Sequence, residues 1–132
     1  MSAAVCLPKK AVREPELHFA LADFLAVVLP ADAVAYHVPN GGLRDKATAA
    51  KLVRMGIRAG VPGLAIVHRG RALFLEAKAQ HGELSRDQRA MIAALGDAGA
   101  EVAVVRSVED AAAALGVWGV PLRARVRAQT PD

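Results

Sequence analysis

Glu76 and Lys78 are the residues of this sequence whose types and spacing most directly indicate chemistry. They end an apolar run that begins at Ala72 and has the length and composition of a β-strand. Because side chains alternate along a strand, both are predicted on one face, opposite Leu73 and Leu75. Such a pair fits two interpretations: a hydrolytic site, or a surface ion pair at a strand end. The triplet taken alone favours the ion pair.

Composition limits the classes of protein to consider. A chain of 132 residues, 54% of them hydrophobic, has room for one compact domain with a core of aliphatic side chains and alanine. The net charge of +4 favours a polyanionic partner only weakly. The longest apolar stretch, Phe19 to Leu29, is interrupted by Asp23 and is too short to span a bilayer. We therefore expect a soluble protein with no membrane partner.

The single cysteine, Cys6, excludes an internal disulfide and a zinc site built on cysteines. A reducing cytoplasm is accordingly the expected compartment.

The elements expected around Glu76 alternate between helices and strands. A helical spacing of apolar residues starts at Glu14 and must end at Pro30. Ser85 and Gln88 form a capping-box pattern that starts another helix. The remaining predicted elements are a strand at 34–38, a turn at 39–42, a helix from 45 to about 57, a hairpin at 64–67 and 72–77, a strand at 102–105 and a helix from 107 that ends at Gly116. This order predicts an α/β fold with a small mixed central sheet flanked by helices.

Both ends of the chain are basic and lie outside the predicted domain, residues 14–116. Residues 1–13 show no periodicity and are interpreted as a flexible basic arm. Residues 117–132 form a basic tail in which Arg123, Arg125 and Arg127 alternate. An extended tail would present these arginines on one side, toward a phosphate backbone, and a solvated disordered tail is the other interpretation. Trp118 is expected to cover an edge of the sheet.

Several short motifs give the Glu76–Lys78 pair a context. His37 to Gly42 reads His-Val-Pro-Asn-Gly-Gly and is followed by Arg44; Gly60 to Leu64 reads Gly-Val-Pro-Gly-Leu; Gly82 to Ser85 reads Gly-Glu-Leu-Ser and is followed by Gln88. Their order and spacing resemble the VRR-NUC family of the PD-(D/E)XK nuclease superfamily, across most of the chain. The resemblance implies a restriction-endonuclease-like fold and a bacterial or phage source.

The resemblance also implies a site that hydrolyses phosphodiesters with Mg²⁺ or Mn²⁺. A divalent ion stabilises charge on the phosphate and activates a water, and a nearby lysine orients that water. By this resemblance, Glu76, Lys78 and Gln88 are the catalytic residues, and the metal ligands are Glu76, the carbonyl of Ala77 and Glu16. Gln88 has a purely structural interpretation as well, as the second half of the capping box with Ser85.

One position departs from the family pattern. Gly63 stands where the family has the aspartate that serves as the principal metal ligand. Glycine offers no side-chain oxygen, so activity is expected to be weakened or lost. Three explanations stay open: a substitution made to trap substrate, a natural loss of catalysis, or replacement by another acid. The acids near enough in sequence are Glu14, Asp45 and Glu83.

The expected partner is DNA, by resemblance branched DNA such as a Holliday junction, and the expected assembly is a homodimer. Candidate DNA contacts are Asn40, Arg44, Lys46, Lys51 and Arg54. His37 is a further candidate for approach to the substrate, whereas His18 and His81 are expected to face solvent. Three functions remain: a metal-dependent endonuclease, a non-catalytic module that binds DNA structures, and a soluble α/β interaction protein without a site.

Overall fold

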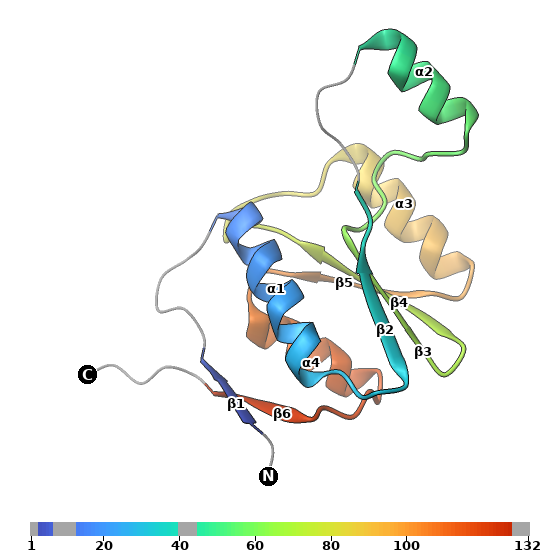
Figure 1. Ribbon diagram of the computed structural model, residues 1–132. Coiled ribbons are helices and arrows are strands. Elements are labelled where there is room, and N and C mark those ends of the chain that lie inside the picture. The colour runs from blue at the N-terminus through green and yellow to red at the C-terminus, as the bar shows by residue number, and fades with distance from the viewer. Residues whose placement is uncertain (1–2, 7–12, 40–44, 128–132) are drawn as a thin grey trace.

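The computed structural model describes residues 3–6, 13–39 and 45–127, and side chains within 13–39 and 45–123. In these residues the chain forms four helices and two sheets (Figure 1). In chain order the elements are β1 (Ala3–Cys6), α1 (Glu14–Val28), β2 (Ala33–His37), α2 (Lys46–Arg54), β3 (Leu64–His68), β4 (Arg71–Ala77), α3 (Arg86–Asp97), β5 (Glu101–Val105), α4 (Val108–Val117) and β6 (Ala124–Arg127).

The central sheet has the strand order β2-β3-β4-β5. Strands β2, β3 and β4 pair antiparallel, whereas β4 and β5 pair parallel through the crossover helix α3. The register places His37 opposite Leu64 and Glu76 opposite Val104. The start of β3, the end of β4 and the end of β2, at His37, therefore lie at the same end of the sheet.

Helices α1 and α4 cover one face of this sheet and form the core with it (Figure 1). Leu17, Leu21, Phe24, Leu25 and Val28 of α1 are all buried, at the spacing that places them on one face of a helix. Leu73 and Leu75 of β4 face this core and are inaccessible to solvent. The position of Glu14 and of the residues that follow it is thus fixed by the packing of α1.

The opposite face of the sheet is covered only in part. Helix α3 contacts β5 and buries Met91, but Val34, Tyr36 and Val67 on β2 and β3 stay exposed. Helix α2 projects from the body of the molecule and contains no buried residue (Figure 1).

The structure confirms the predicted mixed α/β fold, and each predicted helix and strand is present within a few residues. Two details differ. The last helix continues past Gly116 to Val117, and the chain turns at Gly119, whose φ of 74° favours glycine. Trp118, which was expected at a sheet edge, is buried and belongs to the hydrophobic core.

The two ends of the chain form a small sheet that the sequence did not indicate. Strand β1 lies within the segment interpreted as an irregular arm, and it pairs parallel with β6 (Figure 1). A short pairing between segments at opposite ends of the chain leaves no local periodicity to detect. The backbone of the arginine tail is extended through Arg127, but the directions of its side chains beyond Arg123 lie outside the described part.

Two phenylalanines on α1 test the core assignment. Phe24 is 1% exposed and Phe19 is 67% exposed. We expect Phe24→Ala to lower the free energy of unfolding by about 3–5 kcal/mol, because it removes buried area and leaves a cavity. Phe19→Ala, the matched control, should change it by less than about 0.5 kcal/mol. Urea denaturation of both variants measures the difference, and equal losses would contradict the packing of α1.

Candidate active site

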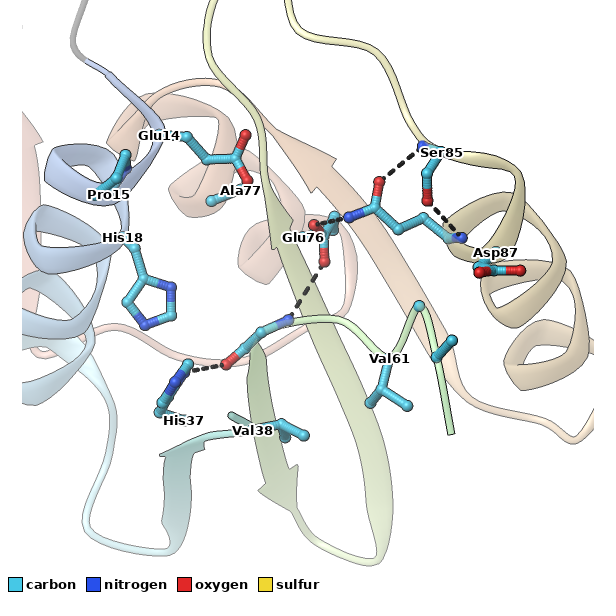
Figure 2. A pocket seen from close by; sticks show the side chains of 14 residues that line it. Glu14, Pro15, His18, His37, Val38, Val61, Glu76, Ala77, Ser85 and Asp87 are labelled. Carbon is cyan, nitrogen blue, oxygen red and sulfur yellow. Dashed lines mark hydrogen bonds between the residues drawn. The ribbon is translucent and has the colours of Figure 1, made fainter. Parts of the chain in front are cut away.

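A pocket of about 700 Å³ opens where α1, the ends of β2 and β4 and the start of α3 meet (Figure 2). Its described lining contains three carboxylates and two imidazoles, but no lysine or arginine. The lining residues are Glu14, Pro15, His18, His37, Val38, Ala59, Gly60, Val61, Gly63, Glu76, Ala77, Ser85, Asp87 and Gln88.

Glu76 is held by a hydrogen bond to each oxygen of its carboxylate. The side-chain Nε2 of Gln88 donates to Oε1 over 3.0 Å, and the backbone N–H of Gly63 donates to Oε2 over 3.3 Å. The residue is 6% exposed. Three segments, the end of β4, the loop before β3 and the first turn of α3, are thereby tied together at one carboxylate (Figure 2).

Gln88 caps α3 and holds Glu76 at the same time. The side-chain Oε1 of Gln88 accepts a hydrogen bond from the backbone N–H of Ser85 at 2.8 Å. The backbone N–H of Gln88 donates to Ser85 Oγ at 3.1 Å. Because the amide oxygen is used by the cap, the amide nitrogen must face Glu76, where it donates to the carboxylate. The structural and functional interpretations of Gln88 are therefore compatible.

The backbone of Gly63 is fixed on both sides. Its N–H donates to Glu76, and its carbonyl oxygen lies 2.8 Å from the N–H of Val38 and 2.9 Å from Nδ1 of His37. A Cβ atom built at Gly63 would meet only the His18 ring, at 3.4 and 3.6 Å, which is ordinary contact. A Cβ at this position therefore has room beside the His18 ring.

Gly60 brings the loop before β3 onto α3. Its φ is 84°, and a Cβ there would lie 2.3 Å from the carbonyl oxygen of Asp87. No other residue type fits this close approach without displacing the backbone. The loop that carries Gly63 is thereby pressed against the first turn of α3.

The electrostatics of the pocket favour a cation beside Glu76. Burial raises the pKa of Glu76 above its ordinary value, although the positive charge of Lys78 and the Gly63 N–H act in the opposite direction. The nearby carboxylate of Glu14 raises the pKa of Glu76 further. A carboxylate in this state is stabilised by any additional positive charge.

Lys78 does not form the surface ion pair that the Glu-x-Lys triplet first suggested. It is 8% exposed, and its Nζ lies 3.9 Å from Oε2 of Glu14. Its backbone N–H continues the pairing with β5 by donating to Val105. Both charged members of the triplet are thus buried at the carboxyl end of the strand, where hydrogen bonds to Glu76 and the nearby Glu14 carboxylate beside Lys78 offset the cost of burial.

Glu14, not Glu16, is the acid of α1 that reaches the pocket. Glu14 and His18 are four residues apart and share one helix face, whereas Glu16 lies about 200° away around the axis. The side chain of Glu16 is hydrogen-bonded to Arg13, whose Nη2 donates to Oε1 over 2.7 Å. This hydrogen bond lowers the pKa of Glu16. The structure therefore does not bring the predicted ligand Glu16 to Glu76, and it places Glu14 there instead.

His18 and His37 lie side by side in the pocket. Their rings make an edge-to-face contact with centroids 4.6 Å apart, and Figure 2 shows the His18 ring pointing from α1 into the cavity. Burial lowers the pKa of His18, and the neighbouring His37 adds to this effect. The expectation that His18 faces solvent was wrong. The direction of its side chain depends on which face of α1 packs inward, and the residues around His18 do not determine this. His81 is exposed, as expected.

The other predicted residues are dispersed. Ala77, whose carbonyl was predicted as a metal ligand, lines the pocket. Lys46, Lys51 and Arg54 are exposed on α2 and do not line the pocket. Asn40 and Arg44 lie outside the described residues. Of the substitute acids, Asp45 caps α2 by accepting from Thr48, and Glu83 is exposed outside the pocket, which leaves Glu14.

The donors present do not fit Mg²⁺. This ion requires near-octahedral coordination, mostly by oxygen. Within the described part of the chain, no three His, Cys, Asp or Glu side chains lie close enough together to hold a metal ion. Glu76, Glu14 and the Ala77 carbonyl supply suitable oxygens, but Gly63 adds none from a side chain.

The family model of the VRR-NUC domain matches residues 29–109, more than half of the chain, and the protein therefore belongs to the VRR-NUC family. This is a family of nucleases that are typically metal-dependent. The match begins after α1, so Glu14 and His18 are placed by the structure alone.

A solved structure described as "VRR_NUC domain protein" has the same fold. It is 18% identical in sequence, with a TM-score of 0.60, and the similarity covers 89% of this chain and 95% of that one. No curated protein matches the sequence. No helix in the described residues has the length and apolar character needed to cross a membrane.

The raised pKa of Glu76 predicts a pH dependence of stability. The pKa of Glu76 is near 4.5 in the unfolded chain and higher in the folded protein. At a pH between these two pKa values, Glu76 is ionised in the unfolded chain but still protonated in the folded protein. The free energy of unfolding of the wild type therefore falls as pH rises through this window. Relative to wild type, Glu76→Gln should therefore gain stability across this window and keep the gain at neutral pH. Urea denaturation in EDTA from pH 4 to 7 measures it. Glu83→Gln, at an exposed position, is the control, and parallel curves for wild type and Glu76→Gln would contradict the assignment.

Proposed function

We propose that this protein is a nuclease-fold domain that binds branched DNA, and that its phosphodiester hydrolysis is weakened or lost because Gly63 carries no carboxylate. One observation carries the proposal: the hydrogen-bonded frame around Glu76 is complete, while the position of the missing ligand is a glycine held at both its N–H and its carbonyl. The frame supports descent from a working site, and the glycine supports its impairment.

The roles of the remaining residues follow from their positions. In an active form of this site, Glu76 would hold the cation, and the hydrogen bond from Gln88 would keep its carboxylate in place. By the family resemblance, Lys78 would orient the attacking water, although it does not itself line the pocket, and its Nζ lies 3.9 Å from Oε2 of Glu14. A divalent ion such as Mg²⁺ or Mn²⁺, when bound, stabilises charge on the phosphate.

Contacts to DNA are proposed on α2. Lys46, Lys51 and Arg54 are exposed on a helix that projects beside the pocket, and residues 59–61 of the segment that follows it line the pocket itself. Phosphate contacts of this kind are strongly salt-dependent. The homodimer implied by the family resemblance stays a prediction; the exposed apolar side chains of Val34, Tyr36 and Val67 are the surface that it would cover.

Restoring the carboxylate tests the proposed defect. We expect Gly63→Asp to increase cleavage of a four-way junction in Mg²⁺ or Mn²⁺ by about 100-fold or more, the scale on which one charge-stabilising group affects rate. Gly63→Asn, with the same shape and no charge, is the matched control and should stay near wild type. Glu76→Ala in the Gly63→Asp background should abolish the gain.

Failure of Gly63→Asp to cleave any branched, duplex or single-stranded DNA would remove Gly63 as the cause of impairment. Efficient cleavage by the wild type would show that the site needs no aspartate at this position.

The role of α2 is tested by salt titration of DNA binding. Each phosphate contact adds about 0.9 to the slope of log K against log salt, so replacing Lys46, Lys51 and Arg54 by alanine should lower the slope by up to about 2.7. Arg69→Ala, at the far end of the β3–β4 hairpin, serves as the control and should leave the slope unchanged. An unchanged slope in the triple variant would place the DNA elsewhere on the surface.

A second function is favoured by the same glycine: a non-catalytic module that recognises DNA structure. It predicts junction binding that is tighter than duplex binding and indifferent to Gly63→Asp. The two functions differ in whether the Gly63→Asp variant cleaves.

A further inference from the structure

We propose that a cavity at the turn of the β3–β4 hairpin binds the phosphate group of a small molecule through His68, Arg69 and Arg71. The cavity measures about 520 Å³. Its described lining contains two arginines and an imidazole but no carboxylate, and consists of His68, Arg69, Arg71, Gly119, Val120 and Pro121. The balance of charge in this lining favours an anion.

The location of the cavity separates it from the surface proposed for DNA. Arg71 begins β4, and Glu76 lies five residues further along the same strand, roughly 17 Å away in an extended chain. Helix α2 projects from the end of the sheet that carries Glu76, opposite the hairpin turn (Figure 1). The proposal therefore concerns a second site and does not rest on the proposed DNA function.

The carboxylate of Asp32 holds two of the three basic side chains together. Its Oδ1 lies 3.1 Å from Nε2 of His68, and its Oδ2 accepts a hydrogen bond from Nε of Arg69 at 3.0 Å. The hydrogen bond from Arg69 lowers the pKa of Asp32, and the contact with His68 lowers it further. Because an ionised carboxylate only accepts hydrogen bonds, Nε2 must be the protonated ring nitrogen of His68.

The other ring nitrogen of His68 remains for a ligand. His68 is 4% exposed and lies directly opposite Arg71 in the hairpin register. Its Nδ1 makes no hydrogen bond with the part of the chain that the structure describes. A phosphate group matches Nδ1 in either charge state, since a neutral Nδ1 accepts from a P–OH group and an imidazolium Nδ1 donates to an ionised oxygen. An ionised carboxylate offers only the second of these contacts.

Both guanidinium groups are already held in place by the protein. Arg71 donates through Nη1 to the carbonyl of Trp118, and Arg69 is held through Nε by Asp32. Each guanidinium keeps further N–H groups, whose planar arrangement matches the oxygens of a phosphate. Groups that are fixed before binding lose little conformational freedom when the ligand arrives.

The backbone at Arg69 is an independent observation that favours a role for its side chain. Arg69 has a φ of 49°, the one positive value among the described residues other than glycine, and Gly70 follows with a φ of 78°. A two-residue hairpin turn with positive φ at both positions favours Asn-Gly. Strained conformations of this kind cluster at ligand sites. The alternative is that Arg69 only ties the hairpin to Asp32.

Phosphate binding by the full chain, without DNA, tests the proposal. Nuclear magnetic resonance titrations with inorganic phosphate at constant ionic strength follow the arginine side-chain N–H signals and the His68 ring. The wild type is compared with Arg69→Asn, which creates the favoured Asn-Gly turn and should fold at least as stably, and with Arg71→Gln. Arg89→Gln, at an exposed position on α3, removes the same charge and is the matched control.

We expect the wild type to bind inorganic phosphate and a nucleoside 5′-monophosphate, and acetate more weakly. Arg69→Asn and Arg71→Gln should each weaken phosphate binding by about tenfold or more, the ratio that corresponds to the loss of one charge-assisted hydrogen bond. Arg89→Gln should match the wild type. A DNA duplex without terminal phosphates should not displace inorganic phosphate.

The proposal would be overturned by equal phosphate affinities in Arg69→Asn and Arg89→Gln, or by a wild type that shows no saturable binding. Reduced thermal stability of Arg69→Asn with unchanged phosphate affinity would assign Arg69 to the tie with Asp32 alone. Acetate binding as tight as phosphate binding would rule out phosphate selectivity, and displacement by the duplex would assign the cavity to the DNA backbone.

Discussion

The burial of one carboxylate at the carboxyl end of β4 is the constraint on which the site depends. Glu76 would be costly to bury unpaired, and its two oxygens are satisfied by donors from two other segments. Meeting this requirement fixes the first turn of α3 through Gln88 and the loop before β3 through Gly63. The capping box, the close approach of Gly60 to α3 and the paired ends of β3 and β4 all serve the same junction.

This frame is independent of the side chain at position 63. The contacts that hold Gly63 come from its backbone N–H and carbonyl, so they do not depend on its side chain, and only proline would remove the N–H. The fold therefore does not require a carboxylate at this position. The pocket contains a buried glutamate, and the side chain nearest a Cβ at position 63 is that of His18.

Much of the fold could be predicted from local pattern. Apolar spacing located α1, the alternation before Glu76 located β4, and Ser85 with Gln88 located the start of α3 within a residue. The β1–β6 pair could not be predicted in this way, because its two strands are short and lie at opposite ends of the chain. The burial of Trp118 likewise depends on packing against elements distant in sequence.

For the site itself, the sequence alone determined the residue types: the Glu76–Lys78 pair, the capping Gln88 and the glycine at position 63. Local propensity and motif order are encoded in neighbouring residues, so they can be read without coordinates. Only the tertiary structure decided which acid of α1 reaches the pocket, because Glu14 and Glu16 differ only in the helix face that packing turns inward. It also decided that His18 borders Gly63, a contact between residues on separate elements that no local pattern encodes.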